Sequence, residues 1–159
     1  MFSQINNIYS YKCMKLKFIF LGKKHPKSFS ILMEKYFRRL NMFVKSELLF
    51  VQEKNPNKLN QKISKHINAK SYLMILDEKG AQLDTLNYAK LIKKKMINYD
   101  SLIFIVGDAY GIPQTLIDKS DSIISLSKMT LPHLVARLML LEQMYRVFTV
   151  LNNHPYHHE

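Results

Sequence analysis

Cysteine, glycine and acidic residues are scarce in this chain of 159 residues. Its single cysteine, Cys13, excludes an internal disulfide, and no Cys or His spacing resembles a zinc ligand set. A reducing, cytoplasmic setting without a bound metal is therefore expected. The longest apolar segment is interrupted by Arg137, Glu142 and Arg146, so no membrane span is expected. The glycine-rich phosphate motifs G-x-x-x-x-G-K-[ST] and G-x-G-x-x-G are absent too.

Positive charge is abundant and unevenly distributed. The formal net charge is +12, and residues 1–100 hold 20 Lys and Arg against 7 Asp and Glu. Residues 101–159 hold 4 against 5. A basic field of this kind favours a polyanionic partner, and nucleic acid is the commonest large one in a cytosol. The competing explanation is an AT-rich genome, which enriches Lys, Asn and Ile throughout a protein.

Short apolar runs predict strands at residues 16–21, 43–51, 72–76, 102–106 and 122–126. The last three runs are continuous rather than alternating, which is typical of strands covered on both faces. Helices are predicted between the strands. An amphipathic one follows Pro26, a weaker one carries Leu59, Ile63 and Ile67, and a third begins at Asp84 or Thr85 and ends at residues 93–95.

A short helix and then a long one after Pro132 complete the pattern. The alternation predicts an α/β fold with a mostly parallel sheet and helices on both faces. Residues 14–159 are expected to form one domain, because "MKLKFIFLG" looks like a natural beginning and Met14 is a candidate true start. Residues 1–13 are then an extension of uncertain role.

Three of the predicted strands are expected to run into loops with unusual residues, namely "LDEKG" (residues 76–80), "GDAYG" (107–111) and "SKMTLP" (127–132). Ligands of open parallel sheets bind beyond the carboxyl ends of the strands, so these segments are expected to meet at one pocket. The glycines of "GDAYG" also fit a turn that needs positive φ or close backbone approach. "SKMTLP" offers backbone N–H groups before a helix, or is an ordinary loop and cap.

The long helix after Pro132 is apolar nearly all round, which predicts that a partner subunit covers part of it. Glu142 and Arg146 are four residues apart and fit a surface ion pair, which stabilises a helix by about 0.3–0.5 kcal/mol. The tail "NHPYHH" fits base stacking, proton relay, metal binding or simple fraying, and a purification tag is disfavoured by Pro155 and Tyr156.

Taken together, "LDEKG", "GDAYG", "SLSKMTLPH", "EQMYR" and "NHPYHH" occur in an order and spacing that resembles one family over residues 14–159. This family is the RlmH-type ribosomal RNA large-subunit methyltransferases of the SPOUT class. The resemblance implies a homodimer of α/β subunits with a C-terminal trefoil knot and S-adenosyl-L-methionine as cofactor. It also implies methylation of a pseudouridine at ring N3 in 23S rRNA, on the assembled ribosome.

By motif, the resemblance implies a set of cofactor-binding residues: Leu76, Gly107, Asp108, Ser127, Lys128, Met129, Thr130, Leu131 and Pro132. The family usually has glycine at position 108, and a carboxylate there would attract the sulfonium or crowd the methionine moiety. Removing the imide proton of the target needs a base, or a cation that stabilises the anion. The candidates for this role are His133, Arg146, Tyr156 and His157, with Glu142 orienting Arg146.

Three rival functions stay open at this stage. One is a non-catalytic ribosome-binding factor with the same fold, which Asp108 makes conceivable. Another is a methyltransferase that acts on a different RNA, such as tRNA. The third is a nucleotide-dependent enzyme of small molecules, which the basic first hundred residues disfavour.

Overall fold

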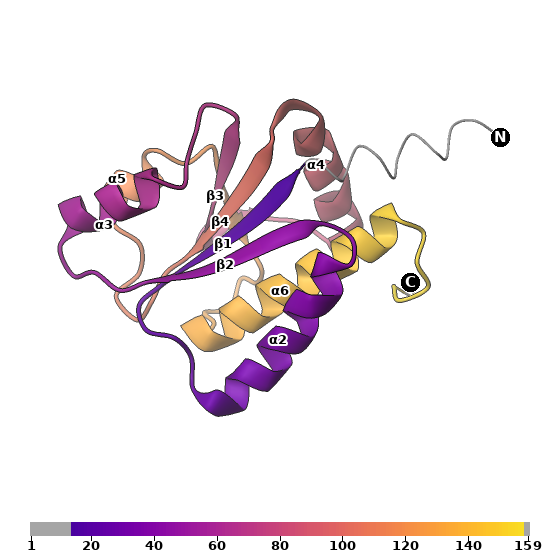
Figure 1. Cartoon of the computed structure of the whole chain (residues 1–159), viewed down its shortest axis with the longest axis horizontal. Coiled ribbons are helices and arrows are strands. Elements are labelled where there is room, and N and C mark those ends of the chain that lie inside the picture. Colours follow the sequence, from indigo (N-terminus) through magenta and orange to yellow (C-terminus); the bar gives the residue numbers. More distant parts are fainter. Residues whose placement is uncertain (1–13, 158–159) are drawn as a thin grey trace.

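The computed structural model describes residues 14–157, so the predicted extension at residues 1–13 lies outside the described residues. Its five strands are β1 (Lys15–Leu21), β2 (Lys45–Val51), β3 (Ser71–Gln82), β4 (Ser101–Val106) and β5 (Ser122–Ser125). They form one sheet in the order β2-β1-β4-β3-β5, and every neighbouring pair is parallel (Figure 1). The predicted parallel sheet is therefore confirmed.

Helices cover both faces of the sheet, as predicted. On one face lie α2 (Lys27–Asn41), α4 (Thr85–Asn98) and α6 (His133–Leu151), whose buried residues join one core cluster. On the other face lie α3 (Pro56–Ser64) and the short α5 (Gln114–Ile117), whose buried residues join a second cluster. Each helix must bury one apolar stripe, and the two faces of the sheet provide the partner surfaces.

The central strand β4 explains why the sequence shows continuous apolar runs. All six of its residues are buried. Leu102, Phe104 and Val106 point into the cluster beneath α2, α4 and α6, whereas Ile103 and Ile105 point into the cluster beneath α3 and α5. Successive side chains of a strand alternate between faces, so a strand covered on both sides is apolar on both, as β4 is over residues 102–106.

The structure differs from the sequence prediction at three element ends. "LDEKG" is not a loop, because β3 continues to Gln82 and both Leu76 and Ala81 pair with Ile124 across an irregularity. Helix α4 does not end at residues 93–95 but runs to Asn98. Helix α3 ends at Ser64, so Ile67 lies beyond it. The extension of β3 follows from its pairing with Ile124 on the neighbouring strand.

The capping prediction for α4 is confirmed for Asp84. Its side chain accepts a hydrogen bond from the backbone N–H of Asn87 at 2.7 Å, and the residue has extended backbone angles. Lys95 is half-buried, and its Nζ lies 4.2 Å from the centroid of the Tyr72 ring. Among residues 14–157, no helix has both the length and the apolar character to cross a bilayer.

Candidate functional site

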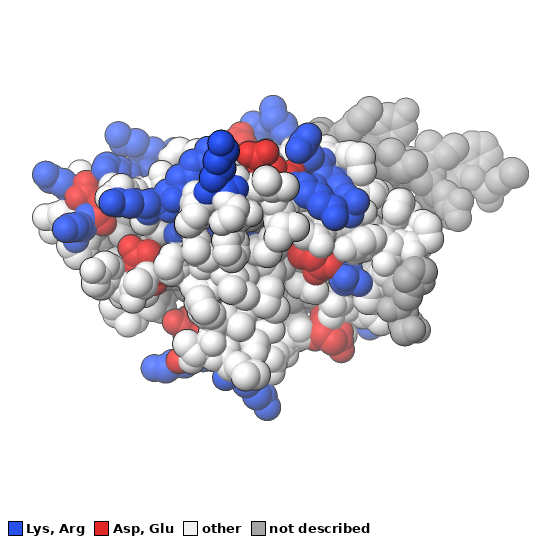
Figure 2. Space-filling view, turned by 90° about the horizontal axis from the view of Figure 1, so that it is seen from below, with Lys and Arg blue, Asp and Glu red and all other residues white. Residues whose placement is uncertain are grey.

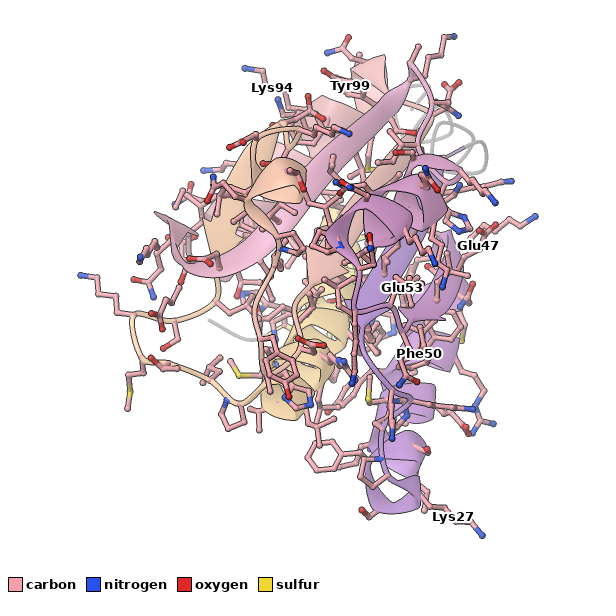
Figure 3. All side chains as sticks on the ribbon, turned by 90° about the vertical axis from the view of Figure 1, so that its left-hand side faces the viewer. Lys27, Glu47, Phe50, Glu53, Lys94 and Tyr99 are labelled. Atoms are coloured by element: carbon pink, nitrogen blue, oxygen red, sulfur yellow. The ribbon has the colours of Figure 1, made fainter. Side chains whose placement is uncertain are left out.

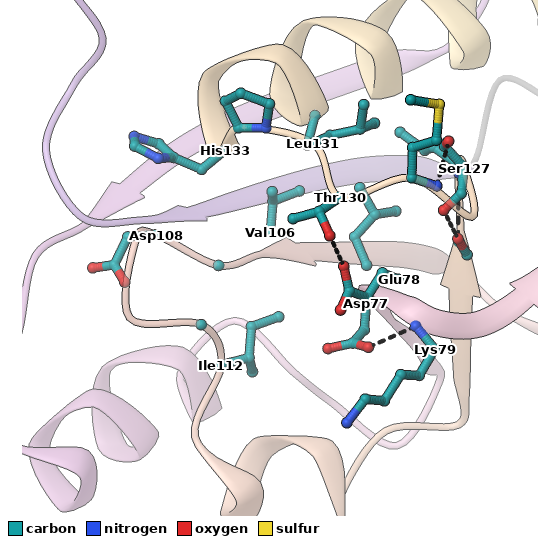
Figure 4. Close-up of a pocket in the computed structure, with 18 of the residues that line it drawn as sticks. Asp77, Glu78, Lys79, Val106, Asp108, Ile112, Ser127, Thr130, Leu131 and His133 are labelled. Atoms are coloured by element: carbon teal, nitrogen blue, oxygen red, sulfur yellow. Dashed lines mark hydrogen bonds between the residues drawn. The ribbon is translucent and has the colours of Figure 1, made fainter.

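A cavity of about 570 Å³ lies at the carboxyl ends of β3, β4 and β5 (Figure 4). Its wall comes from the irregular part of β3, the turn after β4 and the segment between β5 and α6. The prediction that three strand-end segments meet at one pocket is therefore confirmed. Eight of the nine predicted cofactor-binding residues line the cavity: Leu76, Gly107, Asp108, Ser127, Met129, Thr130, Leu131 and Pro132. Lys128 is exposed and is not part of the wall.

The turn after β4 is tight, and its two glycines are needed for different reasons. Gly111 has φ of +81°, a conformation that favours glycine. A Cβ on Gly107 would lie 2.9 Å from the backbone carbon of Gly111, so only glycine allows the two strands of the turn to approach. The N–H of Gly111 donates to the carbonyl of Asp108 at 3.0 Å. The predicted close approach and positive φ are both present.

Asp108 does not extend its carboxylate into the cavity. Figure 4 shows it pointing away from Glu78 and Thr130. Its Oδ1 accepts the backbone N–H of Tyr110 at 2.8 Å, and its Cβ lies 3.0 Å from the position that a Cβ of Gly22 would occupy. The side chain therefore braces the turn and faces the connection after β1. In this conformation it does not crowd the cavity.

The segment between β5 and α6 is held by short polar contacts. The Ser127 hydroxyl accepts the backbone N–H of Met129 at 2.9 Å, and the Ser125 hydroxyl donates to the carbonyl of Ser127 at 2.7 Å. Thr130 donates to Oε2 of Glu78 at 2.6 Å, which joins this segment to the end of β3. Pro132 provides no side-chain cap for α6, so first-turn N–H groups of this helix are available at the cavity edge.

The cavity wall carries more acid than base. Two carboxylates, those of Asp77 and Glu78, and one lysine, Lys79, belong to the lining, whereas Asp108 turns its carboxylate away. Oδ1 of Asp77 accepts the backbone N–H of Lys79 at 2.8 Å, which fixes the shape of the β3 irregularity (Figure 4). The remainder of the wall is apolar or backbone. A small ligand with a positive charge and many hydrogen-bonding edges suits this lining.

The catalytic candidates fall into two places. His133 lies at the start of α6 and lines the cavity. Glu142, Arg146, Tyr156 and His157 form a separate cluster near the end of the same helix. Nε of Arg146 donates to Oε1 of Glu142 at 3.0 Å, and the Tyr156 hydroxyl donates to the same oxygen at 3.3 Å. The predicted ion pair of Glu142 and Arg146 is therefore present.

His157 and the aromatic rings complete this tail cluster. Nδ1 of His157 lies 3.5 Å from a terminal nitrogen of Arg146, whose guanidinium carbon lies 4.9 Å from the centroid of the Tyr156 ring. The Tyr156 ring lies 4.5 Å from the ring of Tyr145. These contacts tie the tail to α6 as far as His157, so fraying does not describe this part of the tail.

The two ionisable groups at the centre of the tail cluster have shifted pKa values. Burial raises the pKa of Tyr156 to about 12, with a hydrogen bond to Tyr36 and the Glu142 carboxylate adding to the effect. The hydrogen bond with Glu142 raises the pKa of Arg146. At neutral pH the Tyr156 phenol therefore keeps its proton and acts as a donor, and Arg146 stays a cation.

Within this chain the tail cluster and the cavity are far apart. Thirteen residues of helix separate His133 from Arg146, which is about 20 Å at 1.5 Å per residue. The structure thus brings together the predicted cofactor segments and His133, but it does not bring the other four catalytic candidates to the same cavity. No group of three or more His, Cys, Asp or Glu that could hold a metal occurs among residues 14–157.

The sequence analysis missed Arg137 as a site residue. Arg137 is only 1% exposed. Its guanidinium donates hydrogen bonds to the carbonyl of Leu21 and, at 3.2 Å, to the carbonyl of Lys23. The guanidinium also lies over the rings of Phe20 and Phe50. It fixes the connection after β1 to the start of α6. The available signal was an arginine in an otherwise apolar helix, a pattern that demands a buried polar partner.

Comparison with known proteins identifies the family. The family described as predicted SPOUT methyltransferase matches residues 14–157. The ribosomal RNA large subunit methyltransferase H of Flavobacterium johnsoniae is 34% identical over 157 residues, covering 92% of this chain and 100% of that protein. The protein of the same name from Malacoplasma penetrans is 32% identical, covering 91% of this chain and 99% of its own length.

A solved structure supports the fold. The crystal structure of a probable methyltransferase from Bordetella pertussis Tohama I aligns with a TM-score of 0.59 and 11% identity, covering 91% of this chain and 99% of that chain. At this identity the likeness concerns the fold only. It agrees with the family match over residues 14–157. This chain belongs to the SPOUT methyltransferase family.

Proposed function

We propose that this protein transfers the methyl group of S-adenosyl-L-methionine to ring N3 of a pseudouridine in 23S rRNA, on the assembled ribosome. The observation that carries the proposal is the convergence of three strand-end segments on one cavity, in a chain that aligns along nearly its full length with proteins named ribosomal RNA large subunit methyltransferase H. The basic first hundred residues suit an RNA substrate.

The cavity residues fit the proposed cofactor. When bound, S-adenosyl-L-methionine supplies an activated methyl group on a sulfonium cation. Backbone groups of Leu76, Gly107 and residues 127–132 would hold its neutral parts, since the two tight turns keep them close to the cavity. The carboxylates of Asp77 and Glu78 favour a positive ligand. Lys128, which is exposed and outside the wall, would contribute through its backbone.

The catalytic roles follow from charge and protonation. Loss of the imide proton at N3 leaves an anion on the base, which a cation stabilises. Arg146 supplies that cation, and Glu142 orients it through the 3.0 Å hydrogen bond. Tyr156, with a pKa of about 12, donates a hydrogen bond rather than accepting the proton. His133 and His157 are then the two candidate bases, one at the cavity and one in the tail cluster.

We further propose that the active site is shared between two subunits of a homodimer. The tail cluster lies about 20 Å along α6 from the cavity of its own chain, so a second subunit is needed to bring a tail to the cavity. Several apolar residues of α6 are only half-buried, and four of them lie near its start: Leu134, Val135, Leu138 and Met139. Figure 2 views the side on which α2 and α6 lie in Figure 1 and shows few charged side chains in the middle of this face.

The same proposal includes the trefoil knot and the single-domain organisation. In SPOUT enzymes the carboxyl-terminal third is threaded through a loop, and the outer position of β5 next to β3 is compatible with this path. Residues 14–159 would act as one domain, in the cytoplasm where ribosomes are found. Residues 1–13 would be dispensable, which a chain beginning at Met14 tests directly through its activity.

A methyl-transfer assay tests the function. Ribosomes from a strain that lacks the modification are incubated with protein and radiolabelled S-adenosyl-L-methionine, and the labelled nucleotide is mapped. Label at one pseudouridine of 23S rRNA is expected. Label in tRNA would instead assign another RNA target. Failure to bind S-adenosyl-L-methionine in calorimetry would favour the non-catalytic ribosome-binding factor.

Mixed dimers test the shared site. A Gly107→Ala subunit with a damaged cavity is combined with a subunit that carries Tyr156→Phe and His157→Ala. If the tail of one subunit serves the cavity of the other, the mixed dimer has one intact site and reaches up to half of the wild-type rate, above the impaired rates of both parent dimers. No recovery above the parent dimers would place both functions within one chain.

A further inference from the structure

A second, larger cleft adjoins the cavity. Its volume is about 900 Å³, and it lies between the connection after β1, the connection after β2 and the start of α6. Figure 3 views the side on which the strands end and shows Phe50 and Glu53, at the end of β2, between α3 and α2. The two spaces share one wall, formed by Asp108, Ala109, Gly111, Ile112 and His133. A ligand that fills the cleft therefore lies against the cavity.

The two spaces differ in the sign of their charge. The cavity has an excess of carboxylates, whereas the cleft is lined by four cationic side chains, those of Lys23, Lys24, Lys54 and Arg137. Two carboxylates also line the cleft. Glu53 is paired with Lys62 at 2.9 Å, and Asp108 accepts the backbone N–H of Tyr110. The cleft therefore suits an anionic ligand, and its neighbour suits a cationic one.

The wall between the two spaces displays an aromatic ring. Tyr110 is 96% exposed, an unusual position for a large aromatic side chain, and it lines the cleft. The turn is held by the hydrogen bond from its N–H to Asp108, at 2.8 Å, and by the positive φ of Gly111. Exposed aromatic rings beside lysines are the usual stacking platforms for the bases of single-stranded nucleic acid.

Two of the lysines of the cleft, Lys23 and Lys24, are carried by an anchored segment. The guanidinium of Arg137 donates to the carbonyls of Leu21 and Lys23, and the His25 ring, 8% exposed, lies 5.3 Å from that of Phe50. Arg137 and His25 thus anchor the main chain on both sides of Lys24. Cationic side chains on an anchored segment lose less entropy when they bind phosphate than those on a mobile loop.

We propose that this cleft captures the RNA strand that carries the acceptor base. Tyr110 stacks on a base, and Lys23, Lys24 and Lys54 bind neighbouring phosphates, which presents the acceptor nucleotide across the shared wall to the methyl donor. Asp108, whose Oδ1 accepts the N–H of Tyr110, is a positioning residue for Tyr110. The inference rests on the proposed function for the identity of the reaction, but its own claim is RNA binding by the cleft.

The test compares cleft variants with matched controls. The binding of a short fluorescent single-stranded RNA is measured at several salt concentrations, and the binding of S-adenosyl-L-methionine is measured by calorimetry. One variant replaces Lys23, Lys24 and Lys54 by alanine. Its control replaces three exposed lysines of α4, Lys90, Lys93 and Lys94. Tyr110→Ala is compared with Tyr110→Phe, which keeps the stacking ring.

The expected results are specific to the cleft. Each phosphate contact on a single strand contributes about 0.7 to the slope of log K against log salt concentration. Loss of three lysine contacts in the cleft triple variant should therefore reduce the magnitude of this slope by about 2 more than the α4 triple variant does. Tyr110→Ala should weaken RNA binding by about 5- to 150-fold, and Tyr110→Phe should not. The affinity for S-adenosyl-L-methionine should stay at the wild-type value in all four variants.

Several outcomes overturn the proposal. They are an equal salt slope in the two triple variants, wild-type RNA affinity in Tyr110→Ala, or no binding of single-stranded RNA by the wild type. The methylation of ribosomal RNA tests the proposed function separately. If the cleft variants lose RNA binding but the wild type methylates no ribosomal RNA, the cleft stands and the function fails. If methylation is normal in the cleft triple variant, the function stands and the cleft proposal fails.

Discussion

Gly107→Ala is the sharpest single perturbation of the cavity. The added Cβ would lie 2.9 Å from the backbone carbon of Gly111 and 3.0 Å from both its oxygen and Cγ1 of Ile112. Carbon atoms in favourable contact are about 3.5–4.0 Å apart, so the turn must open by roughly half an ångström or more. Two of the three opposing atoms belong to the backbone, which cannot move aside as a flexible side chain does.

The consequence can be estimated from the packing. Overpacking of this kind typically costs about 1–3 kcal/mol, and we expect the free energy of unfolding to fall by that amount. The turn forms part of the cavity wall, so the affinity for S-adenosyl-L-methionine should fall by about tenfold or more, which corresponds to about 1.4 kcal/mol of binding free energy. Urea unfolding measures the first quantity, and titration calorimetry measures the second.

A matched control separates instability from damage to the site. Ile63→Val removes one methylene from a fully buried residue of α3, on the opposite face from α6, and should cost about 0.5–1.5 kcal/mol of stability. It should leave the affinity for S-adenosyl-L-methionine unchanged. If Gly107→Ala bound the cofactor as tightly as Ile63→Val does, the turn after β4 would not be part of the cofactor site.

Four further predictions concern stability and protonation. Arg137→Met loses two charge-assisted hydrogen bonds but also removes a buried cation, so the free energy of unfolding in urea should fall by about 1–3 kcal/mol. An unchanged free energy of unfolding would contradict the anchoring role of Arg137. Burial, together with the nearby charges of Arg137 and Lys24, lowers the pKa of His25 from its ordinary value of 6.5. As the pH falls, the unfolded chain therefore protonates this histidine before the folded chain does. The free energy of unfolding should consequently fall as the pH drops below about 6.5. His25→Gln should flatten that dependence, and an identical pH profile would refute it. Tyr156 has a pKa of about 12 in the folded protein against 10.0 in the unfolded chain, so its contribution to stability is lost as the pH rises from about 10 to 12. The difference between the absorbance titrations of the wild type and Tyr156→Phe should show a phenol that ionises near pH 12. Asp84→Ala should lower stability by about 1 kcal/mol in thermal unfolding through loss of the α4 cap, and no change would mean that the 2.7 Å hydrogen bond contributes nothing.

Much of the fold could be predicted because strands that are buried on both faces have continuous apolar runs in the sequence. The apolar runs around Phe104 and Ile105 are continuous since both faces of β4 are covered, and this alone indicates a parallel sheet. The meeting of three segments at one cavity follows from strand direction, because parallel strands end at the same edge. Local cues sufficed at Asp84, where the cap is a short-range interaction.

The remaining features depend on contacts between distant residues. The continuation of β3 beyond Leu76 is decided by pairing with Ile124. The role of Arg137 arises from carbonyls more than a hundred residues away in the sequence. The direction of the Asp108 carboxylate, toward the connection after β1, is a further long-range property that the motif could not reveal.

A crystal structure of the protein with S-adenosyl-L-methionine tests the central claim most directly. Electron density for the methyl donor is expected between Leu76, Gly107 and residues 127–132, with the tail cluster of a second subunit close to the methyl group. Density at any other place, or a cavity closed by its own chain with no second subunit beside it, would contradict the account.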